Sequence, residues 1–101
     1  MEIVSTTRYE VSLAGKADVA GWMDRWTALT ATAAWSSLID VRRTFPTADG
    51  VTLDSGTVVT VFNARGNKYR LLTTIIYPTG TVTLIELLTH AEYDREKWKN
   101  L

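Results

Sequence analysis

The chain has 101 residues, no cysteine and no net charge, with 11 basic and 11 acidic side chains. This length suits one domain with a modest core, so we expect residues 1–101 to form a single domain. The lack of cysteine excludes disulfide bonds and thiol chemistry. No apolar run approaches the roughly 18 residues of a membrane span, and the N-terminal stretch lacks the pattern of a signal peptide. These features favour a cytoplasmic protein without a membrane partner.

The first stretch predicts a short strand and a short helix. Residues 2–5 suit a strand at the edge of a sheet. Thr7 followed three residues later by Glu10 fits a capping box, in which two side chains satisfy backbone N–H groups of the first turn. This pattern predicts a brief helix through Leu13, which Gly15 would end because glycine readily adopts the left-handed conformation at that position.

The main helix is predicted between residue 16 and about residue 34. Its apolar side chains recur at helical spacing and form one stripe that should pack on a sheet. The stripe consists of Val19, Trp22, Met23, Trp26, Leu29 and Ala33. A second, shorter helix is predicted over residues 35–43, with Trp35, Leu38 and Ile39 directed inward.

The segment after this helix is predicted to be a loop. Pro46 should stop the helix, because the residue that precedes a proline disfavours helical geometry. Residues 45–55 contain two turn signals, at Asp49-Gly50 and Ser55-Gly56.

Three strands are predicted in the second half. Residues 58–62 alternate and are rich in Val, Phe and Thr, while residues 69–77 and 81–88 are β-branched and aliphatic runs too short for typical helices. Turn residues at 63–68 and 78–80 separate them. Because connections this short force antiparallel pairing, the strands should form a three-stranded meander. With the helices packed on this sheet, the fold class is α+β.

A short, charged C-terminal helix should follow the last strand and run to about Trp98. Thr89 and Glu92 fit a second capping box at its start. At helical spacing, one face of this helix would carry polar side chains. The residues on or beside this face are His90, Tyr93, Asp94 and Lys97.

Positive charge is concentrated in the same half of the chain. Residues 1–40 hold three basic and five acidic side chains, whereas residues 41–101 hold eight basic and six acidic ones. Local positive charge can bind phosphate, but the overall neutrality counts against strong non-specific affinity for RNA. Lys68 and Arg70 have the same parity on the middle strand, so we expect basic groups to gather on one sheet face.

Seven polar side chains are candidates for a functional site. Arg70 is the strongest candidate, because a guanidinium fork binds two phosphate oxygens and stabilises developing charge. A solvated surface arginine would fit the same pattern. His90, the only histidine, either transfers protons near neutral pH or completes a helix start. The full set consists of Asn63, Arg65, Lys68, Arg70, His90, Tyr93 and Lys97.

Other candidates have two interpretations each. Tyr93 either stacks on an RNA base or packs in the core, and Lys97 either neutralises the RNA backbone or pairs with Asp94. Glu86, unusual in an apolar strand, either faces solvent or acts as a general base. One histidine without cysteine cannot form a typical zinc site, and phosphate-cradling glycine loops are absent. We therefore expect neither metal nor cofactor.

Two motifs together resemble a known family. The run FNARGNKYRL (62–71), followed by a strand pair and THAEYD (89–94), is similar to the HigB family of toxins within the RelE-like messenger-RNA interferases. The similarity extends upstream to Trp35 and to FPTAD (45–49). It implies a RelE-like fold and the toxin component of a toxin–antitoxin system. It also implies a HigA-like antitoxin with a helix-turn-helix domain as a partner.

The resemblance further implies a reaction and residue roles. Such toxins are metal-independent endoribonucleases that cut mRNA on the translating ribosome, by attack of the RNA 2′-hydroxyl on the adjacent phosphate. Arg70 and Lys68 would hold the phosphate, His90 would transfer protons, and Tyr93 and Lys97 would orient the substrate. Asn63 and Arg65 are candidates for contact with the RNA from their residue chemistry, and Arg65 alternatively belongs only to this protein's own surface.

Two other interpretations remain open from the sequence. The same fold would also suit a catalytically silent module that binds RNA or an antitoxin. A small-ligand α+β domain would instead have a closed apolar pocket under the main helix. The sequence leaves open the base preference, the oligomeric state, and whether Arg70 and His90 converge on one site.

Overall fold

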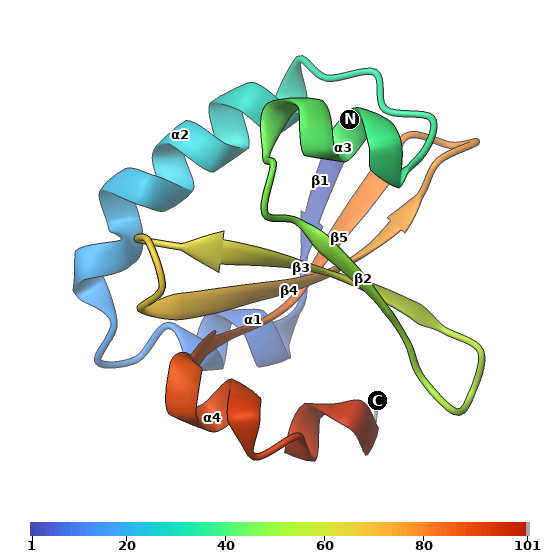
Figure 1. The fold of residues 1–101 in the computed structure, drawn as a ribbon. Coiled ribbons are helices and arrows are strands. Elements are labelled where there is room, and N and C mark those ends of the chain that lie inside the picture. The colour runs from blue at the N-terminus through green and yellow to red at the C-terminus, as the bar shows by residue number, and fades with distance from the viewer. Residues whose placement is uncertain (101) are drawn as a thin grey trace.

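Five strands form one mixed sheet in the computed structural model, which describes residues 1–100 (Figure 1). Their spatial order is β1-β5-β4-β3-β2, with β1 parallel to β5 and every other pair antiparallel. The strands are β1 (Glu2–Ser5), β2 (Asp49–Thr52), β3 (Val58–Ala64), β4 (Tyr69–Ile76) and β5 (Thr81–Thr89). The sheet confirms the predicted meander, as β3–β4–β5, and the N-terminal edge strand.

Strand β2 lies in the segment predicted to be a loop. It pairs antiparallel with β3 and places Gly50 opposite Thr60. Asp49-Gly50 is therefore part of a strand, and the prediction of a turn there was wrong. The hairpin turns at Ser55-Gly56, as predicted, where Gly56 has a φ of 89°. A four-residue strand with one large apolar side chain carries too little periodicity to be recognised in the sequence.

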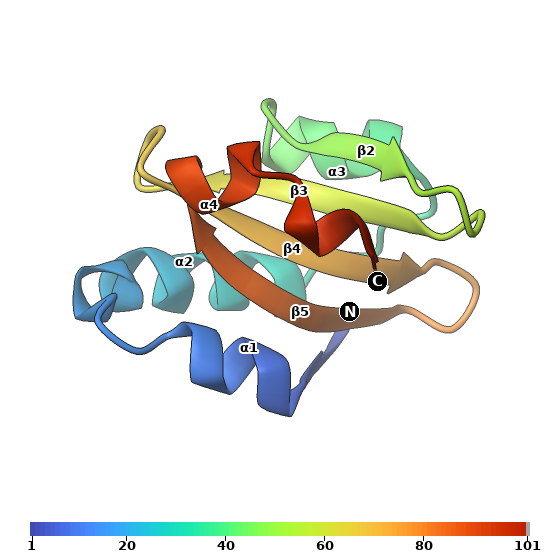
Figure 2. The same ribbon diagram turned by 90° about the horizontal axis from the view of Figure 1, so that it is seen from below.

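The helices lie on both sides of the sheet. They are α1 (Thr7–Ser12), the 3₁₀ turn η1 (Ala17–Val19), α2 (Ala20–Ala31), α3 (Leu38–Thr44), α4 (His90–Asp94) and the 3₁₀ turn η2 (Lys97–Asn100). Helices α2 and α3 lie on one face, and α4 with η2 lies on the other (Figures 1 and 2). None of the helices in residues 1–100 is long and apolar enough to cross a membrane.

Three helix boundaries differ from the predictions. The N-cap of α1 is Thr6, whose hydroxyl accepts from the Tyr9 N–H at 3.0 Å, so the capping box predicted at Thr7 was wrong. The predicted main helix is a 3₁₀ turn followed by a shorter α2. The second helix begins after Ser37, which is extended, and Trp35 therefore precedes it.

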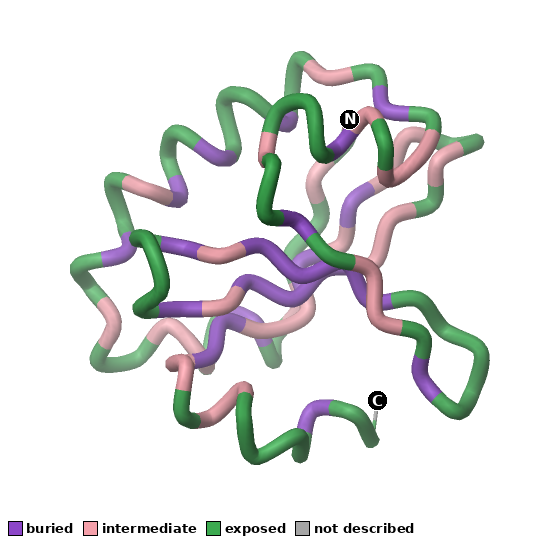
Figure 3. The backbone as a smooth tube through the Cα atoms, in the orientation of Figure 1, coloured by how far each residue is buried: buried purple, intermediate pink, exposed green. Residues whose placement is uncertain are grey.

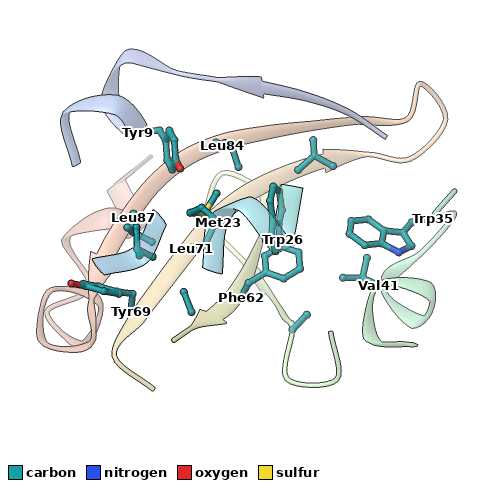
Figure 4. Close-up of a cluster of buried hydrophobic side chains, with 14 residues drawn as sticks. Tyr9, Met23, Trp26, Trp35, Val41, Phe62, Tyr69, Leu71, Leu84 and Leu87 are labelled. Atoms are coloured by element: carbon teal, nitrogen blue, oxygen red, sulfur yellow. The ribbon is translucent and has the colours of Figure 1, made fainter. Parts of the chain in front are cut away.

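The larger core lies between the sheet and helices α1 to α3 (Figure 4). Trp26 of α2 meets Phe62 of β3 edge-on, with ring centroids 5.5 Å apart, and Trp35 stacks on Phe62 at 6.5 Å. Two residues predicted to face inward are instead exposed, Leu29 at 43% and Ile39 at 67%. Both lie beside the buried stripe of their helix, because the buried positions are Met23, Trp26 and Thr30 in α2 and Val41 in α3.

A smaller core covers the opposite face of the sheet. Its buried residues are Leu53, Val59, Val61, Leu72, Leu88 and Trp98, with Tyr93 packed against them. Trp98 is only 2% exposed, and its indole N–H donates to the Tyr93 carbonyl at 2.9 Å. Both faces of the central strands are therefore buried, whereas the turns at their ends are exposed (Figure 3).

The terminal helix is shorter than predicted. Helix α4 ends at Asp94, and Glu96 adopts a left-handed φ of 59°. This reversal turns the chain back over the sheet and inserts Trp98 into the smaller core. The prediction of one continuous helix through Trp98 was wrong, because burying this indole is worth more than one further helical turn.

The terminal segment should therefore contribute substantially to the free energy of unfolding. Replacing Trp98 by alanine removes a buried aromatic ring, and we expect this to lower the free energy of unfolding by about 3–5 kcal/mol. The matched control is Ile39→Ala, which truncates an exposed side chain and should change stability by less than about 0.5 kcal/mol. Urea unfolding followed by circular dichroism measures both. Equal stabilities for the two variants would contradict the packing described for Trp98.

Candidate functional site

Adjacent residues of β4 point to opposite faces of the sheet. Tyr69 and Leu71 belong to the larger core, on the α2 side. Leu72 belongs to the smaller core on the α4 side, and Arg70 lies beside Tyr93 of α4 on that same side. The alternation of the strand thus places Arg70 on the face that α4 only partly covers.

Neutral groups hold the Arg70 side chain. Its guanidinium donates to the Asn67 side-chain carbonyl at 2.6 Å, to the Asn67 backbone carbonyl at 3.3 Å and to the Tyr69 carbonyl at 3.1 Å. It also lies 5.7 Å from the centroid of the Tyr93 ring. Asn63 is directly opposite in β3. Within residues 1–100 no carboxylate forms an ion pair with Arg70, so its orientation is fixed while its charge is not neutralised.

His90 begins helix α4 at the same end of the sheet. Its backbone N–H donates to the Lys68 carbonyl at 3.1 Å, and its Nε2 lies 3.2 Å from the Asp94 carboxylate. The predicted capping box is confirmed: the Thr89 N–H donates to Glu92 at 2.9 Å, and the Glu92 N–H donates to the Thr89 hydroxyl at 3.1 Å. The first of these bonds lowers the pKa of Glu92. The start of α4 is therefore fixed with the His90 ring 45% exposed.

Tyr93 connects Arg70 to the smaller core. Its ring stacks on Trp98, with centroids 5.0 Å apart and an interplanar angle of 13°. Trp98 and Arg70 both contact the ring, which leaves less of its surface for a base to stack on in this arrangement. Burial raises the pKa of Tyr93. Its phenol therefore stays protonated at neutral pH and suits a hydrogen-bond donor better than a stacking platform.

Lys68 does not lie with Arg70, and the prediction that they share a face was wrong. The Lys68 ammonium contacts the Asp18 carboxylate, which also accepts from Arg65 at 3.2 Å and from the Tyr69 hydroxyl at 2.6 Å. Lys68 belongs to the β3–β4 turn and not to β4, so strand parity does not apply to it. In this turn Arg65 has a φ of 52°, and both cations are directed toward η1 on the α2 side.

Asp18 is the residue that sequence reasoning missed. It lies 50 positions before Lys68, and no local motif marks it. The hydrogen bonds from Lys68 and then Tyr69 lower the pKa of Asp18 to about 2, and Asp18 in turn raises the pKa of both partners. The carboxylate thus fixes the β3–β4 turn to the segment that begins α2.

Lys97 is exposed and lies beyond the end of α4. The left-handed Glu96 separates it from the helix, so Lys97 does not share a helical face with His90 and forms no ion pair with Asp94. The prediction of a shared face was wrong, and the pairing with Asp94, which was one of two interpretations of Lys97, is not formed. Its proposed contact with RNA stays a prediction.

Ion pairing sorts the eleven Lys and Arg side chains into two groups. Seven pair with a carboxylate: Arg8, Lys16, Arg42, Arg43, Arg65, Lys68 and Lys99. Four have no such partner within residues 1–100: Arg25, Arg70, Arg95 and Lys97. Three of these four, all except Arg25, lie at β4 or on the terminal segment. The cations without a carboxylate partner in the described chain therefore lie mostly on the α4 side, while Arg65 and Lys68 share the single carboxylate of Asp18.

Comparison with known proteins identifies a related family. A family model described as HigB_toxin, RelE-like toxic component of a toxin-antitoxin system, matches residues 20–96. The matched part contains Arg70, His90 and Tyr93 but excludes Asp18. A search of curated proteins found no match.

The Asp18 interactions predict a pH-dependent contribution to stability. Because the pKa of Asp18 is lower in the folded chain, about 2 against 3.8, its stabilisation is fully present above about pH 4 and is lost as the pH falls toward 2. Asp18→Asn should therefore be less stable than wild type at neutral pH, and the difference should shrink in acid. Urea unfolding over a pH series measures this. A difference that stays constant down to pH 2 would contradict the charged interaction.

Proposed function

The chain belongs to the HigB family of RelE-like toxins, the toxic components of toxin–antitoxin systems, and we propose that it is an endoribonuclease. In this proposal it cleaves messenger RNA on the translating ribosome. The RNA 2′-hydroxyl attacks the adjacent phosphate, which yields a cyclic phosphate and a free 5′-hydroxyl. The nucleophile comes from the substrate, so the protein only has to position the RNA, neutralise charge and transfer protons.

The orientation of Arg70 is the observation that carries the proposal. Asn67 holds the guanidinium through neutral oxygens, and within residues 1–100 no carboxylate neutralises it. A charged fork fixed in this way can bind two oxygens of the scissile phosphate and stabilise the charge that develops there. Because its positioning bonds are already formed, little reorganisation is needed when the phosphate binds.

His90 and Tyr93 supply the groups that transfer or donate protons. Asp94 contacts His90 Nε2 and orients the ring, as the carboxylate partner of a catalytic histidine does. The protonated Tyr93 phenol would donate to a phosphate oxygen or to the leaving 5′-oxygen. We propose that Asn63, opposite Arg70, and the exposed Lys97 orient the RNA on either side of this centre.

In this proposal Lys68 and Arg65 have a structural role and do not bind the scissile phosphate. Asp18 engages both cations, so Lys68 is not assigned as a second phosphate ligand. Its backbone carbonyl instead receives the His90 N–H, and its turn carries Asn67. The two side chains anchor the turn that positions Arg70 and His90.

The neutral net charge supports a ribosome-bound substrate. Free RNA binding depends on many phosphate contacts, and most of the cations here are already paired. The ribosome would supply the positioning that the toxin surface lacks. Family membership implies an antitoxin partner, and we propose that it is a HigA-like protein with a helix-turn-helix domain.

The alternative is a module of the same fold that binds RNA or antitoxin without cleaving. Both proposals predict binding, so only the fate of the RNA separates them. Growth arrest on expression, relieved by the product of the neighbouring gene, would support a toxin. Stable RNA binding without arrest would support the silent module.

The first test is to substitute Arg70. After brief induction in growing cells, mapping of mRNA 5′ ends should show new ends inside reading frames for wild type, and Arg70→Ala should reduce them about 10²–10³-fold, as the loss of one charge-stabilising donor does. Arg25→Ala removes an equally unpaired arginine from α2 and should leave the ends unchanged. New ends at wild-type level in Arg70→Ala would move the chemistry elsewhere. Their absence in folded wild-type protein would favour the silent module.

The second test concerns proton transfer at His90. We expect His90→Ala to slow single-turnover cleavage of ribosome-bound mRNA about 10²–10⁴-fold while it leaves binding unchanged, because the ring is exposed and carries no core contact. Asp94→Asn keeps the size of the orienting group and should reduce the rate less. Quenched-flow measurement with purified ribosomes gives both rates. An unchanged rate for His90→Ala would remove this residue from the mechanism.

A further inference from the structure

A polar cleft lies beside α4, on the sheet face that carries Arg70. It has a volume of about 180 Å³ and opens between α1, β5 and the terminal segment. Leu88 and the buried Trp98 form its floor. Charged side chains form its walls, contributed by Arg8, Glu86, Glu92, Arg95 and Lys97.

Its two carboxylates are already engaged. Glu86 pairs with Arg8 at 3.0 Å, and Glu92 pairs with Lys16 at 3.1 Å and closes the capping box of α4. These pairs cancel. Two cations, Arg95 and Lys97, remain at the opening without a carboxylate partner within residues 1–100.

Two acidic residues flank Arg95 in the chain, Asp94 and Glu96, and neither forms an ion pair with it within residues 1–100. Lys99 holds Glu96 at 2.9 Å, so that carboxylate is also neutralised. Asp94 contacts His90, which lies one helical turn before it in α4. Arg95 and Lys97 are both exposed and are therefore free to bind an anion at the opening.

The cleft is continuous with the surface that carries Arg70. In the β4–β5 ladder, Arg70 lies directly opposite Leu88, and Leu72 lies directly opposite Glu86. Residues paired in this way have Cβ atoms about 4.5–5.5 Å apart and point to the same face. Arg70 is therefore one strand away from the cleft floor, with only α4 rising between them.

We infer that this cleft is a second RNA subsite, in which Arg95 and Lys97 bind the phosphate of a nucleotide flanking the cleavage position. This inference rests on the proposed function. A single strand held at Arg70 crosses α4 and meets the next uncancelled cations at the cleft. The sugar of that nucleotide enters between the Arg8–Glu86 pair and Trp98. Arg95 is thus an RNA-binding residue that strand and helix patterns did not identify.

Salt dependence tests this subsite, because each phosphate contact on a single strand contributes about 0.7 to the slope of log K against log salt concentration. The ligand is a 2′-O-methyl RNA oligonucleotide, which lacks the attacking hydroxyl and stays intact. Fluorescence anisotropy over a KCl series gives the slope. Because both cations bind one phosphate, the Arg95→Ala/Lys97→Ala double variant should lower the slope by about 0.7, and each single variant should lower it by less. Arg95→Lys, which keeps the charge, should retain the wild-type slope.

Arg25→Ala is the matched control, since it removes one unpaired cation from α2 and should not change the slope. A slope of the double variant equal to that of Arg25→Ala would overturn the subsite, as would wild type that does not bind the oligonucleotide even at low salt, where phosphate contacts are strongest. Neither result decides the proposed cleavage, which 5′-end mapping with Arg70→Ala tests separately. Conversely, lowered slopes in a protein that produces no new 5′ ends would keep the subsite and reject the nuclease.

Discussion

The carboxylate of Asp18 is the interaction on which the geometry of the site depends. It receives hydrogen bonds or ion pairs from Arg65, Lys68 and Tyr69 and fixes the β3–β4 turn to the start of α2. The same turn supplies the two groups that position the functional side chains. Asn67 accepts from the Arg70 guanidinium, and the Lys68 carbonyl accepts from the His90 N–H. One exposed turn thereby fixes a strand residue and a helix residue relative to each other.

The sheet contributes rigidity because both faces of its central strands are buried. Helices α1 to α3 pack on one face, where aromatic side chains of the helices and the sheet form a cluster. The other face is covered only by α4, η2 and the indole of Trp98. This thin cover leaves the edge of the strands open beside Tyr93. Polar residues such as Arg70 can therefore point out of a strand that is otherwise part of the core. The rigid strand then fixes the position of their side chains.

The sequence revealed those parts of the fold that local patterns determine. The meander follows from short apolar runs and tight turns, and the second capping box from two side chains three residues apart. Strand β2 has too few residues for a pattern. The break at Glu96 was missed because it depends on where Trp98 can be buried, which is a property of the assembled sheet. The position of Lys68 was missed for the same reason, since its partner Asp18 is distant in the chain.

For a phosphate-binding surface, the distribution of unpaired charges is more informative than the net charge. The chain is neutral overall, which by itself argues against nucleic-acid binding. Its carboxylates, however, pair selectively with seven of the eleven Lys and Arg side chains. Local electrostatics are set by the charges that remain after pairing. Within residues 1–100 the cations without a carboxylate partner are Arg70, Arg95 and Lys97 around α4, with Arg25 apart from them, while Arg65 and Lys68 share Asp18. A neutral chain can in this way present a cationic face of limited size, which suits a substrate that another large assembly already holds in place.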